Sequence, residues 1–532
     1  MRKYIFISLG VLLLQIGNAF PTEGCFSDFF EKGKQAYNQL DFENAIVNFE
    51  AAQICPDNSK EQSDQAIEWI NKSKNGYIDA IKKEISISES NRLAFFANQE
   101  NERANYSDAL ALAHKALTLN REKATPLVKR AFGDAVYSKY RVALDKHEDI
   151  ILEAIWSPDG KKVLSRSRDL TAKVWNLKGE VLASLEGHTG AILSICFSPD
   201  GKNILTTAAD QTAVLWSEQG KKKAVLSGHT DAVTSAAFSP DGKNIVTTAR
   251  DHTAKLWNDS GVFIADLAGH TAPVVSAEFS SDSKYLLTRS LDKTVRVWSN
   301  LGKFMGILKD HQSYIYNASF SENRAYALTA SADETARLWR KTGETVALLK
   351  GHNNYLTTAI FSPDGKEMLT TSADHSAILW NLKGEKVAVL KGHTDVVSGA
   401  TFSADGESIL TWSKDNTAIL WNRKGQLLSK LNQHTRDVNS ASFSPDGKTI
   451  LTASEDGTAK LWDRTGNVIM NINEQITKVI GAAFSPDGTR ILTYGPEYTA
   501  YLSPTPTSVE KQLAQNPLPA FSEEKKKKYG IR

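Results

Sequence analysis

Residues 228–267 read GHTDAVTSAAFSPDGKNIVTTARDHTAKLWNDSGVFIADL, and this stretch decides the fold. It contains four short runs rich in β-branched and apolar residues, which are 233–238, 244–249, 253–257 and 263–267. The tetrapeptide Ser239-Pro240-Asp241-Gly242 suits a type I turn, which favours Ser at its first position, Pro at its second and Gly at its fourth. Short runs of this kind, bounded by turn residues, predict four antiparallel strands.

The same pattern recurs at a fixed interval of 41 residues. Eight of the 11 tryptophans keep this interval: Trp175, Trp216, Trp257, Trp298, Trp339, Trp380, Trp421 and Trp462. Eight of the 11 histidines also keep it: His147, His188, His229, His270, His311, His352, His393 and His434. So do eight aspartates: Asp169, Asp210, Asp251, Asp292, Asp333, Asp374, Asp415 and Asp456. A hydroxyl residue stands four positions before each aspartate: Ser165, Thr206, Thr247, Thr288, Thr329, Thr370, Thr411 and Thr452. A repeat this regular indicates one supersecondary unit per period.

A ninth unit is present but has diverged, with Gln475, Thr493, Glu497 and Ser503 at these four positions. Four-stranded sheets repeated radially leave only short, protected edges, so the pattern predicts an all-β propeller over residues 136–515. We expect eight or nine blades. In a nine-blade ring, residues 137–144 would supply the outer strand of the ninth unit, because 505–513 makes a poor strand. In an eight-blade ring, one unit would lie outside.

On these residues, the units resemble WD repeats. The match rests on the turn aspartate, on the tryptophan that ends the third strand, and on a glycine before five histidines, namely Gly187, Gly228, Gly269, Gly351 and Gly392. The related Ser-Pro-Asp-Gly propellers of periplasmic proteins share the turn but lack the His and Trp spacing. The resemblance implies a structural tetrad in each blade, in which the indole N–H donates to the hydroxyl, the hydroxyl bonds the histidine, and the histidine bonds the aspartate.

A hydroxyl, an imidazole and a carboxylate are also the parts of a nucleophilic triad. An enzyme needs one activated site, whereas this set recurs eight times at one spacing and without an inserted loop. We therefore expect these residues to be structural, and we predict no catalytic residues. The sequence has no Cys/His or carboxylate cluster with metal-ligand spacing and no glycine-rich phosphate loop, so we predict no metal and no cofactor. His252 and His375, which fall outside the spacing, are expected to be exposed turn residues.

Positions that differ between otherwise similar units are candidates for partner binding, because packing does not dictate them. Two such positions are the residue before each turn aspartate and the third residue after each histidine. In WD-repeat proteins, both lie on the face that usually meets partners. Tyr314 and Tyr355 occupy the second position in adjacent units, and Arg250 and Lys414 occupy the first. These four residues form the predicted partner face; neutral variation on a solvated face is the alternative.

The amino-acid composition limits the class of partner that we expect. The chain has 532 residues, with 63 Lys plus Arg against 61 Asp plus Glu. The resulting net charge of +2 argues against a protein built to bind nucleic acid. Residues 516–532 form a tail in which we expect the lysines at 525–528 to be solvated. After the amino terminus, no segment is apolar enough to span a membrane, and no small-molecule substrate is evident.

Residues 1–19 are typical of a secretory signal peptide. Arg2 and Lys3 precede an apolar run from Ile5 to about Ile16, and small residues follow up to Ala19. The run is too short for a membrane anchor. We therefore expect cleavage near Ala19 and export to the periplasm, the cell surface or the medium.

Residues 26–135 lack the strand pattern and predict four to six helices. Small and aromatic residues at 29–56, and again at 104–116, resemble tetratricopeptide repeats, which implies paired helices that bind proteins. Cys25 and Cys55 lie at neighbouring ends of the first pair. Because an exported protein meets oxidising conditions, a disulfide between them is one hypothesis, and two free thiols are the other.

The leading functional hypothesis is an exported, non-enzymatic scaffold that binds proteins through the propeller face and the helical arm. The alternative is a ligand- or glycan-sensing propeller of the cell envelope that uses the centre of the ring.

Overall fold

The computed structural model describes residues 24–55, 58–322, 325–473 and 477–531. It divides into two compact units. The first comprises the described residues up to Arg92 together with 118–124, and the second comprises 93–117 and the residues from Thr125 onward. The predicted signal peptide, residues 1–19, lies outside the described residues. Among the helices that are described, none is both long and apolar enough to cross a membrane.

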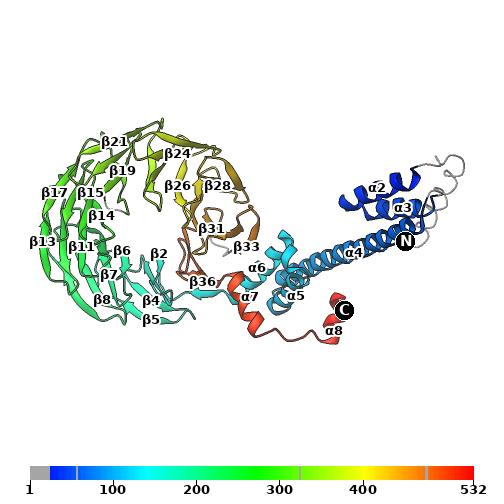
Figure 1. Cartoon of the computed structure of the whole chain (residues 1–532). Helices are drawn as coiled ribbons and strands as arrows, with labels where there is room; N and C mark the ends of the chain where they lie inside the picture. The colour runs from blue at the N-terminus through cyan, green and yellow to red at the C-terminus, as the bar shows by residue number, and fades with distance from the viewer. Residues whose placement is uncertain (1–23, 56–57, 323–324, 474–476, 532) are drawn as a thin grey trace. The chain divides into compact units, whose positions relative to one another are not determined.

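Nine four-stranded antiparallel sheets form the blades of a ring in the second unit (Figure 1). Blades 1 to 8 each use four strands that are consecutive in the sequence. Blades 1 and 2 contain β2 (Ile151–Trp156), β3 (Lys162–Ser167), β4 (Ala172–Asn176), β5 (Val181–Leu185), β6 (Ile192–Phe197), β7 (Asn203–Ala208), β8 (Ala213–Ser217) and β9 (Lys222–Leu226). Blades 3 and 4 contain β10 (Val233–Phe238), β11 (Asn244–Ala249), β12 (Ala254–Asn258), β13 (Phe263–Leu267), β14 (Val274–Phe279), β15 (Tyr285–Ser290), β16 (Val295–Ser299) and β17 (Phe304–Leu308).

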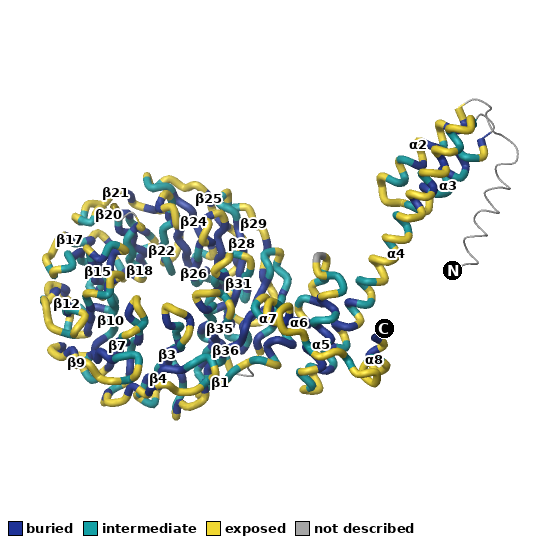
Figure 2. The backbone as a smooth tube through the Cα atoms, turned by 60° about the horizontal axis from the view of Figure 1, so that its bottom comes forward, coloured by how far each residue is buried: buried dark blue, intermediate teal, exposed yellow. Residues whose placement is uncertain are grey.

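Blades 5 and 6 contain β18 (Ile315–Phe320), β19 (Tyr326–Ser331), β20 (Thr335–Arg340), β21 (Thr345–Lys350), β22 (Leu356–Phe361), β23 (Glu367–Ser372), β24 (Ser376–Asn381) and β25 (Lys386–Lys391). Blades 7 and 8 contain β26 (Val397–Phe402), β27 (Ser408–Ser413), β28 (Ala418–Asn422), β29 (Leu427–Leu431), β30 (Val438–Phe443), β31 (Thr449–Ser454), β32 (Thr458–Asp463) and β33 (Val468–Asn473). The first strands of neighbouring blades lie against one another around the centre of the ring, and the fourth strand of each blade is the outer edge. Figure 2 shows how burial is concentrated in the middle strands.

Blade 9 is closed by a strand from the other end of the propeller sequence. Its own strands are β34 (Gly481–Phe484), β35 (Arg490–Tyr494) and β36 (Ala500–Pro504), and β1 (Val142–Leu144) pairs with β36. The nine-blade prediction is confirmed, and the alternative with one unit outside an eight-blade ring is wrong.

The predicted closing strand at 137–144 is wrong over its first half, because helix α6 (Pro126–Tyr140) extends into it. Thr125 caps this helix by accepting the N–H of Val128, and Pro126 stands at its start. The helical region thus continues to Tyr140. Likewise, α7 (Pro506–Gln515) occupies 506–513, which leaves blade 9 without a fourth strand of its own.

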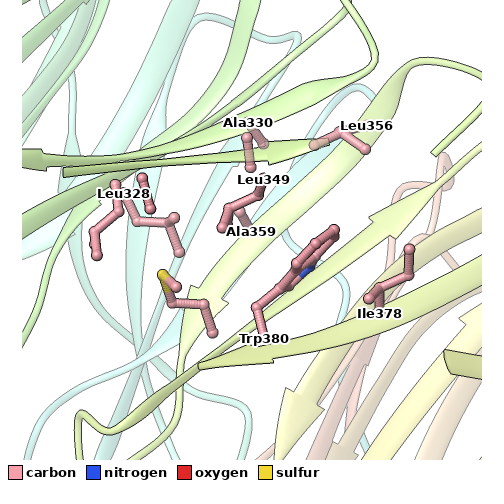
Figure 3. Close-up of a cluster of buried hydrophobic side chains, with 11 residues drawn as sticks. Leu328, Ala330, Leu349, Leu356, Ala359, Ile378 and Trp380 are labelled. Carbon is pink, nitrogen blue, oxygen red and sulfur yellow. The ribbon is translucent and has the colours of Figure 1, made fainter. Parts of the chain in front are cut away.

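The hydrophobic core of the ring lies in the seams between blades. In the seam between blades 5 and 6, Leu328 and Leu349 pack with Leu356 and Trp380 (Figure 3). Every such cluster that contains a repeat tryptophan combines residues from the tryptophan's own blade with residues from the blade before it. Eight seams of the ring are filled in this way, so each tryptophan joins two blades.

The ninth seam, between blades 8 and 9, has Ser503 at the tryptophan position and is filled instead by helix α6. Tyr137 is only 4% exposed and packs with Leu461 and Ile491. Its hydroxyl donates to the carbonyl of Asn473 at 3.3 Å.

Helix α6 also covers the outer edge of blade 8. Gly133 passes so close to the Ile469 carbonyl that a Cβ atom would collide with it. The next residue, Asp134, accepts the N–H of Asn471 at 2.6 Å. Tyr137 and Asp134 thus bind a carbonyl and an N–H of β33 in place of a neighbouring strand, which protects this edge.

The first unit is built on the helix pair α2 (Cys25–Asn38) and α3 (Phe42–Gln53), with the first half of α4 (Lys60–Glu102). Phe30, Phe49 and Trp69 form its aromatic core. Cys25 and Cys55 are joined by a disulfide, with their Cα atoms 5.8 Å apart. The tetratricopeptide resemblance of this region stays a prediction.

The remaining helical segments are α5 (Tyr106–Leu119), the 3₁₀ turn η1 (Arg121–Lys123) and α8 (Glu523–Tyr529). The expectation of a solvated lysine run is wrong for Lys525 and Lys528, which form ion pairs with Asp108 and Glu100. These ion pairs hold α8 against α4 and α5.

Candidate interaction surface

Four side chains form the same hydrogen-bonded chain in each of blades 1 to 8. In blade 3, Nε1–H of Trp257 donates to Oγ1 of Thr247 at 3.0 Å, and Oγ1 lies 2.9 Å from Nε2 of His229. Nδ1 of His229 then lies 2.8 Å from Oδ2 of Asp251. The structure brings the same four positions together in blades 2, 4 and 6: His188, Thr206, Asp210 and Trp216; His270, Thr288, Asp292 and Trp298; and His352, Thr370, Asp374 and Trp380.

The aspartate charge sets the direction of each hydrogen bond. An ionised Asp251 only accepts, so Nδ1 of His229 carries the proton and Nε2 accepts from the hydroxyl of Thr247. Burial lowers the pKa of His229 although Asp251 acts to raise it, and the imidazole is neutral at pH 7. Burial alone would raise the pKa of Asp251, but hydrogen bonds from the Thr253 hydroxyl, the Thr230 N–H and His229 hold it below its usual range.

A fifth residue belongs to the network, although the sequence comparison did not single it out. Oδ1 of Asp251 accepts both the hydroxyl of Thr253 at 2.7 Å and its N–H at 2.9 Å. The same contact recurs two residues after the turn aspartate in all eight blades, from Thr171, Thr212, Thr253, Thr294, Thr335, Ser376, Thr417 and Thr458. These residues also keep the 41-residue spacing, which was the signal that could have revealed them.

The tetrads stabilise the blades and present no reactive group to a substrate. The side chain of His229 is fully buried, and so is Thr247. The Thr247 hydroxyl is committed to the imidazole, and the carboxylate pins the turn that follows the second strand. In the described part of the chain, no three His, Cys, Asp or Glu side chains are grouped so as to hold a metal ion. His252 and His375 are exposed, and each occupies a left-handed turn position directly after the aspartate.

The two variable positions chosen from the sequence lie side by side in each blade. The N–H of the residue before the turn aspartate donates to the carbonyl of the third residue after the histidine, as from Arg250 to Ala232 and from Ala373 to Tyr355. The predicted residues therefore occupy equivalent places in blade 3 (Arg250), blade 5 (Tyr314), blade 6 (Tyr355) and blade 7 (Lys414). Blade 4 separates Arg250 from the other three.

Tyr316, at the start of the inner strand of blade 5, joins the predicted tyrosines. Its ring lies 6.1 Å from that of Tyr355, centroid to centroid. Tyr314, Tyr316 and Tyr355 are 51%, 49% and 37% exposed. We call these three residues the tyrosine rim. Comparing the fifth residue after each histidine would have revealed Tyr316, because other blades carry smaller residues there, such as Thr234 and Ser398.

A small cavity of about 200 Å³ lies between the inner strands of blades 4 and 5, beside Tyr316. Glu278 also lines it and is exposed. Oδ1 of Asn317 is buried there and has no hydrogen-bond partner among the described residues. Arg289 also lines the cavity, but it is committed to the Ile315 carbonyl at 2.8 Å and so links the two blades.

Comparison with known proteins gives two family matches. Residues 234–502, slightly more than half of the chain, match the family described as IFT122 first beta-propeller, and residues 138–176 and 179–217 match the WD domain, G-beta repeat. Similar solved structures include the C-terminal WD40 domain of Sif2, at 18% identity over 68% of this chain and 98% of that one, with a TM-score of 0.50. At this identity, the likeness concerns the fold alone. No curated protein matches the chain.

Proposed function

Because the chain belongs to the WD-repeat β-propeller family, and slightly more than half of it matches the IFT122 first beta-propeller, we propose that it is a non-enzymatic scaffold that binds a protein partner over blades 5 to 7. The tyrosine rim would be the centre of the contact surface. Lys414, in the next blade, would contribute a charge at its edge.

The observation that carries this proposal is the exposed tyrosine rim on an otherwise repetitive ring. Tyrosine supplies a large contact area with few rotatable bonds and a polar hydroxyl, so it is enriched at the centres of protein interfaces. The tetrads hold the turns beside it in place, and a preorganised surface loses little conformational entropy on binding. Arg250 would join the surface only if the partner also covered blade 4.

The test is capture of the partner with the full chain, followed by identification of the contact. Tyr314→Ala/Tyr355→Ala should reduce capture at least tenfold, which corresponds to about 1.4 kcal/mol. The control is Arg168→Ala, an exposed residue directly before the turn aspartate of blade 1. A photo-crosslinking side chain at position 316 should attach to the same partner. Equal loss with the blade 1 variant, or no crosslink at 316, would overturn the proposal.

Export is part of the same proposal. It is supported by the signal-like residues 1–19 and by the Cys25–Cys55 disulfide, since such bonds persist in oxidising compartments. The mature protein should begin near Phe20 and resist thiol labelling at both cysteines until it is unfolded and reduced. Recovery of the protein with Met1 intact from the reducing interior of the producing cell would contradict export.

A second candidate function is ligand or glycan sensing near the centre of the ring. It is favoured by the cavity between blades 4 and 5, which is lined by the polar residues Asn317 and Glu278. A small molecule rich in O–H or N–H donors fits these groups. If a panel of sugars raised the melting temperature of the native chain but not of Asn317→Ala, while no protein partner was captured, sensing would replace the scaffold proposal.

A further inference from the structure

The end of α4 and the start of α5 form the surface against which helix α8 packs, in the helical part of the second unit, and we call this surface the groove. Glu100 and Asp108 point into it, and their side chains are only 4% and 10% exposed. Asn105, in the turn between the helices, donates to both carboxylates, at 2.8 and 3.0 Å. Two carboxylates that are so buried and share one amide need positive charge nearby, because a buried unpaired charge is costly.

Helix α8 supplies that charge from the far end of the sequence. Nζ of Lys525 lies 2.5 Å from Oδ1 of Asp108, and Nζ of Lys528 lies 3.1 Å from Oε1 of Glu100. Burial acts to raise the pKa of Glu100, but hydrogen bonds from Asn105, Lys528 and Arg103 lower it to about 2. The Glu100 carboxylate is therefore ionised. It pairs with Lys528, and Asp108 pairs with Lys525.

Tyr529 adds an apolar anchor to the two ion pairs. It is 2% exposed, its ring lies 5.8 Å from that of Phe96, and its hydroxyl donates to Oδ2 of Asp108 at 3.3 Å. Lys525, Lys528 and Tyr529 stand at positions i, i+3 and i+4, which share one face of a helix. The groove thus contacts three side chains on one face of the helix.

The sequence of α8 is built to form a single short helix. Ser522 caps its start by accepting the N–H of Lys525. Gly530 ends it in the left-handed conformation, and the N–H of Ile531 returns to the carbonyl of Lys526 at 2.8 Å. This closing arrangement is a Schellman motif. Because a helix this short is marginal alone in water, its folding depends on the groove.

We propose that the groove is a peptide-binding site for short helices of the form Lys-X-X-Lys-Tyr, and that α8 is its resident and exchangeable ligand. The two lysines remain half exposed, so each ion pair contributes little by itself. Docking in cis is favoured because the non-helical segment 516–522 tethers α8 near the groove. A basic helix of the same chemistry from another chain would compete for the site. This proposal is independent of the tyrosine rim.

The test uses the full chain and a fluorescent peptide of residues 519–532, followed by anisotropy. In the full-length variant Lys525→Ala/Tyr529→Ala, the resident helix should leave the groove open, and the peptide should bind. For a Kd of about 100 µM at the open groove, the native chain should bind it roughly tenfold more weakly, because a short tether gives the resident helix an effective concentration of about 1 mM. A cooperative melting transition would show that the variant remains folded.

Charge reversal provides the matched control. Adding Asp108→Lys to the open variant should abolish binding of the native peptide and restore binding of a peptide with Lys525→Asp. Glu102→Lys, an exposed acid next to the groove, should leave binding unchanged. If the folded open variant binds the peptide no better than the native chain does, or if the reversed pair fails to restore binding, the proposal is wrong.

Discussion

At the scale of single residues, the turn after the second strand of each blade combines favourable hydrogen bonds with local strain. The residue after the turn aspartate adopts the left-handed conformation, with φ of 67° at Leu170 and 67° at Asn416. Only blade 8 has glycine there, Gly457. A side chain in this conformation costs about 1–2 kcal/mol, whereas asparagine tolerates it better than leucine does.

Leu170→Gly should therefore stabilise the protein. The gain should be about 0.5–1 kcal/mol, because relief of strain exceeds the greater chain entropy that glycine loses on folding. Urea unfolding of the native chain and the variant measures it. Asn416→Gly is the matched control and should give a smaller gain. A loss of stability in Leu170→Gly would show that contacts of the leucine outweigh its backbone strain.

The tetrad aspartates should contribute far more to the stability of the protein than exposed acidic residues in the same blade do. Asp251→Ala removes four hydrogen bonds and leaves His229 and the N–H of Thr230 without their acceptor, which should cost about 3 kcal/mol. Asp259→Asn, in an exposed turn of blade 3, should change stability by less than about 0.5 kcal/mol. Similar urea midpoints for the two variants would contradict the structural role of the tetrad.

The pH dependence follows from the same groups. The folded pKa values of His229 and Asp251 both lie below their ordinary values, so the unfolded chain binds protons more readily. Their stabilisation is present above about pH 6.5 and is lost on acidification, first through the histidine and below about pH 4 through the aspartate. His229→Gln, which does not titrate, should lose less stability than the native chain between pH 7 and pH 5. Parallel losses would contradict this linkage.

At the scale of elements, helix α6 supplies two contacts that the repeat residues do not provide at blades 8 and 9. Tyr137 fills the seam where Ser503 replaces tryptophan, and Asp134 accepts an N–H from the open edge of β33. Burial raises the pKa of Asp134 to about 6, although the Asn471 N–H and Arg130 act to lower it. Its ionised form is therefore destabilising in the folded state.

Asp134→Asn tests this contact through its pH dependence. The folded pKa exceeds the unfolded one, so the native chain gains stability from this group at low pH and loses it as pH rises from 4 to 6. This loss of stability approaches about 3 kcal/mol, because each pH unit between the unfolded and the folded pKa contributes roughly 1.4 kcal/mol. Asparagine keeps the acceptor and does not titrate, so the variant should become more stable relative to the native chain over that range. A difference independent of pH would contradict the raised pKa.

Sequence alone predicted the elements that repeat far better than those that do not. The strands of blade 3 match their expected ranges to within one residue, because each turn and tetrad position is specified locally and recurs. The contacts of Tyr137 with blade 8 and of Lys525 with Asp108 join residues more than 300 positions apart. Each occurs once, so no periodic pattern indicates it. Tyr316 was missed for a different reason, since only two variable positions per unit were compared.

At the scale of the whole ring, the seam between blades 8 and 9 should open first. Blade 9 has Ser503 in place of the tryptophan that would pack against blade 8. Strand β1 pairs with blade 9 over only three residues. In native-state hydrogen exchange, peptides from 481–504 should exchange faster than peptides from 233–258, because local opening costs least where buried contacts are fewest.

Substitution of Tyr137 should increase the difference in exchange rate between blade 9 and blade 3. Tyr137→Ala leaves a cavity costing about 3–5 kcal/mol and should speed exchange in blades 8 and 9 while leaving blades 3 and 4 unchanged. Tyr137→Phe keeps the ring and loses the hydrogen bonds of the hydroxyl, among them the one to Asn473, so its effect should be nearer 1 kcal/mol. Faster exchange spread evenly around the ring would mean that the blades open as one cooperative unit. Exchange of blade 9 no faster than blade 3 would mean that α6 and β1 close the ring as firmly as tryptophan joins the other blades.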